Sequence, residues 1–129
     1  MNFVKLNLTE NGWSYLYQDA SNIEMGILGI FLTDDVGSSG RGVSIYKEWT
    51  LDDSQSWAVS GNFSVLDKEG DYMFLADQCS QEEDPTELKI SRQQFVKLLD
   101  DWQEKVCKTK PSNVIIKHEN DEYSIETSD

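Results

Sequence analysis

None of the nucleophilic side chains in this sequence lies in a recognisable catalytic setting. A histidine-based triad would have to use His118, the single histidine, but Ser38 and Ser39 lack the G-x-S-x-G frame of a serine nucleophile. Cys79 and Cys107 lie in no catalytic signature and show no C-x-x-C spacing. We therefore predict that the chain has no catalytic residues, that it is not an enzyme, and that both cysteines are free thiols.

Carboxylates are abundant and fall in adjacent groups. These groups are Asp34-Asp35, Asp52-Asp53, Glu82-Glu83-Asp84 and Asp100-Asp101. An EF-hand needs alternating ligands over about twelve residues with a closing glutamate, and none of the groups provides that pattern. A glycosidase needs two carboxylates that face each other across a cleft, an arrangement that abundance does not imply. We expect no bound metal and no cofactor, with a carboxylate pair in a cleft as the enzymatic alternative.

The acidic groups alternate with large aromatic residues along the middle of the chain. The acids fall in predicted loops and turns, and the aromatic residues fall in predicted strands, where they are equally suited to an ordinary core. Charge steers the encounter with a basic partner, and Trp and Tyr are frequent anchors of interfaces. The predicted partner-binding residues are Asp34, Asp35, Tyr46, Trp49, Asp52, Asp53, Trp57, Glu82, Glu83 and Asp84.

One amphipathic helix is predicted over residues 90–110. Ser91 is a suitable N-cap, and Gln94 stands at the position that completes a capping box. The apolar residues recur at spacings of three and four, which places them on one face. They are Phe95, Leu98, Leu99, Trp102 and Val106. Pro111 ends the helix at or just before Lys110.

Most of the remaining chain has the pattern of strands and turns. Hairpins are predicted around Asn11-Gly12 and Asn120-Asp121. The segment 23–32, IEMGILGIFL, is apolar throughout and fits either a central strand or a short buried helix, with strand favoured by its Ile and Phe content.

Three further strands are expected over 43–50, 57–66 and 72–76, and the segment 34–42, DDVGSSGRG, is expected to be a loop. The predicted fold is α+β and forms one domain over residues 1–129. It consists of a mostly antiparallel sheet of six or seven strands, one helix on a face, and a final hairpin.

The charge balance restricts the class of partner. The 129 residues include 24 Asp and Glu against 11 Lys and Arg, a formal net charge of −13. Such a surface repels nucleic acid and anionic membranes and attracts basic proteins, although solubility alone also explains acidity. The N-terminal residues lack the apolar core of a secretory signal, and no apolar run approaches the length of about 18 residues that spans a membrane. We expect a cytoplasmic location.

Three segments resemble parts of a known class of proteins. The segment ISRQQFVKLLDDWQEKVCKTKPSNVIIKHENDEYSIE resembles the closing helix and hairpin of small bacterial immunity proteins from polymorphic toxin and contact-dependent growth inhibition systems. The upstream segments MGILGIFLTDD and GNFSVL are similar to the strands that precede that helix.

The resemblance implies a non-enzymatic cytoplasmic protein that binds the C-terminal domain of a cognate toxin, often a nuclease, and blocks its active site or substrate surface. A nuclease has a basic groove for phosphates, which an acidic inhibitor can occupy. The alternative is an acidic nucleic-acid mimic or adaptor that regulates a resident nucleic-acid-binding protein.

Overall fold

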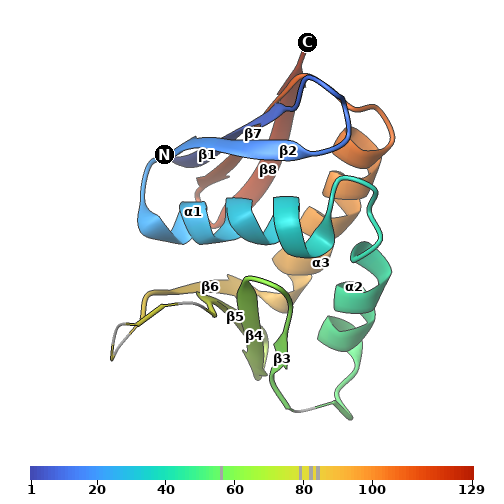
Figure 1. Ribbon diagram of the computed structural model, residues 1–129. Helices are drawn as coiled ribbons and strands as arrows, with labels where there is room; N and C mark the ends of the chain where they lie inside the picture. Colours follow the sequence, from blue (N-terminus) through green and yellow to red (C-terminus); the bar gives the residue numbers. More distant parts are fainter. Residues whose placement is uncertain (56, 79, 82, 84) are drawn as a thin grey trace.

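The computed structural model describes residues 1–55, 57–78, 80–81, 83 and 85–129. Over these residues the fold is α+β, as predicted, but it has two antiparallel four-stranded sheets and three α-helices in place of one sheet and one helix (Figure 1). The elements are β1 (Asn2–Leu8), β2 (Tyr15–Ala20), α1 (Ile23–Ile30), η1 (Phe31–Val36), α2 (Val43–Leu51), β3 (Val59–Ser60), β4 (Ser64–Glu69), β5 (Tyr72–Asp77), β6 (Glu87–Ser91), α3 (Arg92–Trp102), η2 (Gln103–Cys107), β7 (Asn113–Glu119) and β8 (Glu122–Ser128).

The first sheet joins the two ends of the chain, with strand order β2-β1-β7-β8. Both of its predicted hairpins are confirmed. Gly12 has a φ of 73°, and Asn120 and Asp121 have φ values of 54° and 62°. These left-handed conformations are the ones that Gly, Asn and Asp adopt at least cost, so the turn residues fix the register of each hairpin.

The second sheet has the order β3-β4-β5-β6. The single strand predicted over 57–66 is divided in two, because the chain turns at Gly61 and Asn62 between β3 and β4. The last strand of this sheet, β6, leads into α3 without an intervening loop.

The predicted C-terminal-half helix is confirmed as α3 and its π-helical continuation η2. The Ser91 Oγ accepts a hydrogen bond from the Gln94 backbone N–H at 3.1 Å, as expected of an N-cap. The Gln94 side chain does not complete a capping box, because its Oε1 accepts from the Tyr123 N–H of β8. The helical residues end at Cys107, and Lys110 has a φ of 50° just before Pro111.

The strand favoured for residues 23–32 is wrong, and the helical alternative is correct. Asn22 caps α1 by accepting a hydrogen bond from the Met25 N–H at 2.9 Å. Met25, Leu28, Phe31 and Leu32 are completely buried and lie three or four residues apart. Burial on a helical period therefore outweighs the preference of Ile and Phe for strands.

The strand predicted over 43–50 is also wrong, since these residues form α2. Val43, Tyr46, Trp49 and Thr50 are buried, while Ile45 between them is exposed. This spacing of three is that of a helix packed on one side. The segment 34–42, which was predicted to be a loop, is helical in its first three residues, because residues 34–36 belong to η1, the continuation of α1.

α1 lies between the two sheets and contacts β1 and β2 on one side and β5 and β6 on the other (Figure 1). α2 packs against α3 and lies beside β3, an edge strand of the second sheet (Figure 1). Residues of both sheets and all three helices join in one apolar core. None of the helices in the described part of the chain has the length and apolar character needed to cross a membrane.

Candidate functional site

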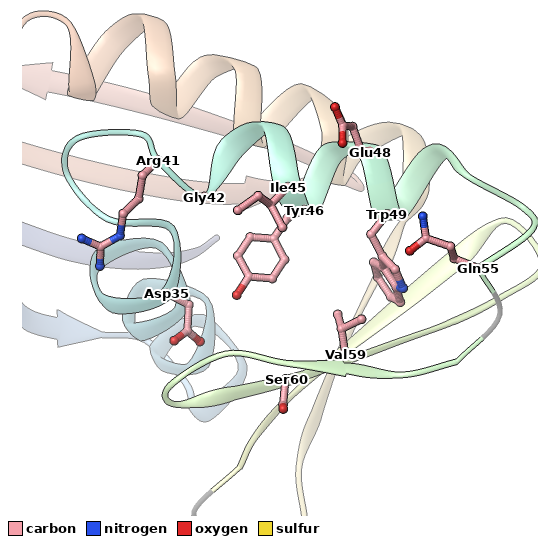
Figure 2. A pocket seen from close by; sticks show the side chains of 10 residues that line it. All are labelled: Asp35, Arg41, Gly42, Ile45, Tyr46, Glu48, Trp49, Gln55, Val59 and Ser60. Atoms are coloured by element: carbon pink, nitrogen blue, oxygen red, sulfur yellow. The ribbon is translucent and has the colours of Figure 1, made fainter.

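A cleft of about 430 Å³ opens between α2, η1 and β3 (Figure 2). Three of the predicted partner-binding residues line it, namely Asp35 of η1 and Tyr46 and Trp49 of α2. The complete lining is Asp35, Arg41, Gly42, Ile45, Tyr46, Glu48, Trp49, Gln55, Val59 and Ser60. Side chains that are separated along the sequence are therefore brought to one concave surface.

Asp35 is the buried carboxylate of the cleft, with 8% of its surface exposed. Its Oδ1 accepts hydrogen bonds from the backbone N–H groups of Asn62 at 2.7 Å and Phe63 at 3.1 Å, which fastens the β3–β4 turn to η1. Its Oδ2 is buried and has no donor among the described residues. A buried polar atom without a partner costs about 1–3 kcal/mol, and more when it is charged. Asp35 thus supplies one satisfied oxygen to the fold and one unsatisfied oxygen beside the cleft.

Gly61 allows this close packing. A Cβ atom placed on Gly61 would lie 2.6 Å from Asp35 Cγ and 2.7 Å from the Tyr46 hydroxyl oxygen. The carboxylate and the hydroxyl therefore converge on the same point of the turn. Burial, and to a lesser degree the charge of Asp35, raises the pKa of Tyr46 above its ordinary value of 10.0. Tyr46 is therefore a neutral hydroxyl at physiological pH.

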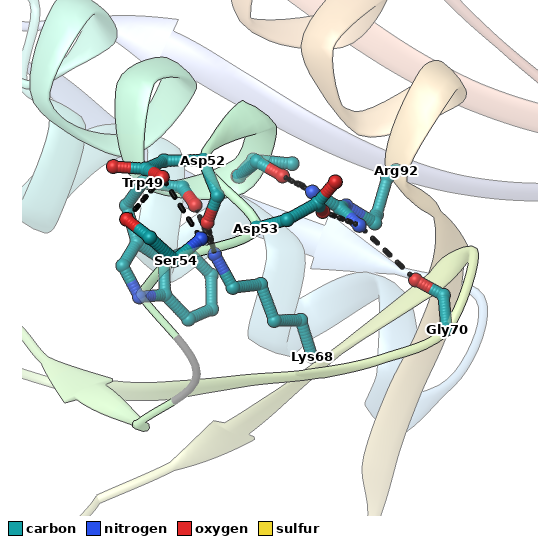
Figure 3. Close-up of polar contacts among 8 residues, drawn as sticks. Trp49, Asp52, Asp53, Ser54, Lys68, Gly70 and Arg92 are labelled. Carbon is teal, nitrogen blue, oxygen red and sulfur yellow. Dashed lines mark hydrogen bonds and ion pairs between the residues drawn. The ribbon is translucent and has the colours of Figure 1, made fainter.

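Trp49 forms the other end of the cleft and is buried, on a helix, where a strand was predicted. Its indole Nε1 donates a hydrogen bond to the backbone carbonyl of Trp57 at 3.2 Å. The Lys68 Nζ lies 4.5 Å from the centre of the indole ring and donates to the backbone carbonyl of Asp52 at 2.7 Å and to that of Trp49 (Figure 3). Lys68 thereby satisfies carbonyl groups at the C-terminus of α2.

The acidic turn after α2 is held by its own side chains. The Asp52 Oδ1 accepts from the Ser54 N–H at 2.9 Å and from the Ser54 hydroxyl at 2.6 Å, and its Oδ2 accepts from the Gln55 Nε2 at 2.9 Å. The hydrogen bonds from the Ser54 and Gln55 side chains, followed by the one from the Ser54 backbone, lower the pKa of Asp52 to about 2.

Asp53 points to the opposite side of this turn and pairs with Arg92, with 2.8 Å between Oδ1 and Nη1 (Figure 3). The Arg92 guanidinium also donates to the backbone carbonyl of Thr50 at 2.7 Å and to that of Gly70 at 3.2 Å. Most of this guanidinium is therefore used inside the protein, whereas the Asp53 side chain is 86% exposed.

The other predicted acids are divided between two places. Asp34 is exposed next to Asp35, but the protein atoms around it still remove part of its hydration. This partial desolvation, followed by the Asp35 charge, raises the pKa of Asp34 above the ordinary value. Glu83 is exposed between β5 and β6 and does not line the cleft. Glu82 and Asp84, like Cys79, lie outside the described residues. Of the predicted residues, the structure therefore places Asp35, Tyr46 and Trp49 in the lining of the cleft. Asp52 and Trp57 are hydrogen-bonded to lining residues, whereas Asp34 and Asp53 lie outside the lining.

The positive charges of the protein are mostly engaged internally. Within the described residues, the ion pairs are Lys47–Asp100, Arg92–Asp53, Lys97–Asp101, Lys108–Glu104 and Lys117–Glu126. Lys105 and Lys110 donate to the backbone carbonyls of Ile125 and Ser38. With 24 acids against 11 bases, this arrangement leaves a large excess of exposed carboxylates.

Sequence reasoning missed several cleft residues, among them Arg41, Ile45, Glu48 and Val59. For Ile45 and Glu48 the available signal is their spacing of three, which places them on one face of a helix but on opposite faces of the strand predicted over 43–50. Cys107 is a free thiol whose Sγ lies 3.7 Å from the Gly37 carbonyl oxygen.

The described residues contain no group of three or more His, Cys, Asp or Glu side chains suited to hold a metal ion. The chain was also compared with models of protein families, with curated proteins and with solved structures. None of these comparisons finds a match.

Proposed function

We propose that the chain is an immunity protein that binds the C-terminal domain of a cognate toxin, a basic nuclease, and neutralises it by stoichiometric occlusion. The observation that carries this proposal is the distribution of charged side chains between internal pairs and the exposed surface. Most cationic side chains of the described residues are paired with carboxylates or carbonyl groups of the chain itself, and many carboxylates remain exposed at the surface. A surface of this kind favours a basic partner through long-range attraction.

The outer face of α2 supplies a surface for such a partner. Ile45 is 65% exposed and Leu51 is 58% exposed, and the exposed Glu48 lies between them on the helix. Trp57, beyond the acidic turn, is 61% exposed. Exposed apolar residues next to carboxylates suit a tight interface with a basic partner. Desolvated apolar contacts slow dissociation, and the charges accelerate association.

Inhibition by this surface requires no chemistry from the immunity protein. A nuclease binds the phosphates of its substrate in a positively charged groove, and exposed carboxylates of an inhibitor compete for the same groups. One immunity protein occupies one toxin domain, and the nucleic acid is excluded for as long as the complex lasts.

Protection of cells tests this function. The toxin domain encoded directly upstream of the chain is expressed under an inducible promoter, with or without the chain on a second plasmid. We expect growth arrest without the chain and normal growth with it. Arrest in both cases, with the chain present in soluble form, contradicts the proposal.

A further inference from the structure

We propose that the cleft between α2, η1 and β3 is a subsite for the guanidinium group of an arginine side chain. That the arginine belongs to a toxin domain rests on the proposed function, whereas the chemistry of the subsite follows from the cleft itself.

The acceptor at this subsite is the carboxylate of Asp35. Oδ1 already accepts two backbone hydrogen bonds, while the buried Oδ2 has no donor within the described part of the chain. Asp35 lines the cleft, and its Oδ2 is covered, so a donor that enters there reaches Oδ2 by displacing the neighbouring side chains of the wall and not by passing through the core (Figure 2). A charged donor is the natural partner, because hydrogen bonds between ionised groups are the strongest available to a carboxylate.

The remaining walls suit a planar cation with an apolar stem. The Tyr46 hydroxyl points toward Asp35 in Figure 2 and offers a second acceptor, and Trp49 and Val59 line the end of the cleft nearest the acidic turn. A guanidinium group is planar, donates in several directions and packs well on aromatic rings. An ammonium group is compact and strongly hydrated, so it uses the aromatic wall less well.

The charge of the lining also favours a cation. Its ionisable carboxylates, Asp35 and Glu48, outnumber its one base, Arg41. Arg41 does not neutralise Asp35, because the described residues include no ion pair between them. Its guanidinium instead lies beside Gly37, whose added Cβ would be 3.7 Å from Arg41 Cζ.

The subsite can be tested without any toxin. The ¹⁵N-labelled chain is titrated with N-acetyl-arginine amide, and the amide signals of Gly42, Ser60 and Gly61 are followed by NMR. N-acetyl-citrulline amide, a neutral isostere, serves as the matched ligand. We expect saturable shifts around the cleft with the arginine derivative and none with the citrulline derivative.

Three variants assign the effect to the cleft. Asp35→Asn keeps the Oδ1 that accepts from Asn62 and Phe63 but removes the charge, and it should weaken binding about tenfold. Tyr46→Phe keeps the ring and should weaken binding about threefold. Asp121→Asn is the control, because it makes the same chemical change at an exposed turn of the other sheet, where Asn is well tolerated. It should bind like the unaltered chain.

Equal shifts with the citrulline derivative, shifts that do not saturate, or unchanged binding by both Asp35→Asn and Tyr46→Phe would overturn the subsite. If Asp35→Asn does not fold, the citrulline comparison and Tyr46→Phe still decide the question. If these experiments show that the subsite does not exist, toxin binding and protection are still measured independently, and the proposed function can stand without it. Conversely, a chain that binds the arginine derivative but does not protect against the toxin retains the subsite and loses the proposed function.

Discussion

The Nε of Arg92, at the start of α3, donates to the backbone carbonyl of Thr50, in the last turn of α2, over 2.7 Å. This contact joins two helices that are 42 residues apart in the sequence. It also fixes the position from which the acidic turn of Asp52 and Asp53 leaves α2 (Figure 3). The orientation of the proposed binding surface therefore depends on a basic residue that itself faces inward.

Replacement of Arg92 should cost much more stability than replacement of its acidic partner. Arg92→Met removes hydrogen bonds to the carbonyls of Thr50 and Gly70, and we expect the free energy of unfolding to fall by about 2 kcal/mol. Asp53→Asn removes only the ion pair with Arg92, and because the Asp53 side chain is 86% exposed, the expected loss is below about 0.5 kcal/mol. Urea denaturation of both variants measures the difference. Equal losses would show that the carbonyl contacts contribute little.

Two glycines of α1 should respond to alanine in opposite ways. A Cβ on Gly26 meets nothing closer than 3.9 Å, so Gly26→Ala should stabilise the protein by about 0.5–1 kcal/mol through helix propensity. A Cβ on Gly29 would lie 2.7 Å from the buried Val4 Cγ2, so Gly29→Ala should destabilise it by about 1–3 kcal/mol. Thermal unfolding gives the sign of each effect. Stabilisation by both substitutions would contradict the packing of α1 on β1.

Asp52 should titrate far below its ordinary pKa of 3.8. Hydrogen bonds from Ser54 and Gln55 favour the carboxylate, so the folded state lowers its pKa to about 2. The resulting stabilisation is present above pH 3.8 and is lost as the pH falls toward 2. We expect carbon NMR of the side-chain carboxyl group to report this pKa, and Ser54→Ala to raise it. An ordinary pKa in both proteins would mean that the turn is not closed in solution.

Charge reversal on the proposed face should act on the rate of association. Glu48 is exposed in the lining of the cleft, and Asp34 of η1 and Asp53 of the turn after α2 are exposed outside it. Joint replacement of these three residues by Lys should slow association with the toxin domain by about tenfold or more at low salt. Asp35 is left unchanged because it holds the β3–β4 turn.

Reversal of Glu10, Glu119 and Glu122 changes the net charge equally on exposed positions of the other sheet and its turns. Stopped-flow or surface-based kinetics should show a smaller effect for this control. Identical rates for the two triple variants would mean that total charge, and not this face, governs the encounter.

The elements that the sequence predicts correctly are those with strong local signals. Ser91 stands directly before an amphipathic run, and Asn11-Gly12 and Asn120-Asp121 require conformations that few other residues adopt. Each of these signals acts within a few residues, so tertiary structure does not alter its meaning. α3 and both hairpins of the first sheet follow from them.

The wrong predictions of secondary structure fall on segments whose conformation is decided by burial in the tertiary structure. α1 is apolar on nearly every side because it lies between two sheets, so its composition does not separate helix from strand. α2 contains β-branched and aromatic residues that favour strands when local propensity alone is considered. When both segments are predicted as strands, no helix separates the strands into two groups, and a single sheet is predicted.

The sequence predicts three of the residues that line the cleft but not the geometry of the cleft. Tyr46 and Trp49 are predicted as interface anchors on a strand, and the structure instead places them on a helix, buried along the wall of a cleft. The double role of Asp35 depends on amide groups 27 and 28 residues further along the chain, and no local pattern records such a contact. Its neighbour Asp34 has the same sequence signature and a different environment.

Calorimetric titration of the chain into the toxin domain encoded directly upstream, with the activity of that domain assayed in the same samples, tests the central claim most directly. We predict one-to-one binding of nanomolar or tighter affinity and a loss of toxin activity in proportion to the complex formed. Absence of binding, or binding that leaves the toxin active, would contradict immunity and would favour an acidic adaptor for another basic protein.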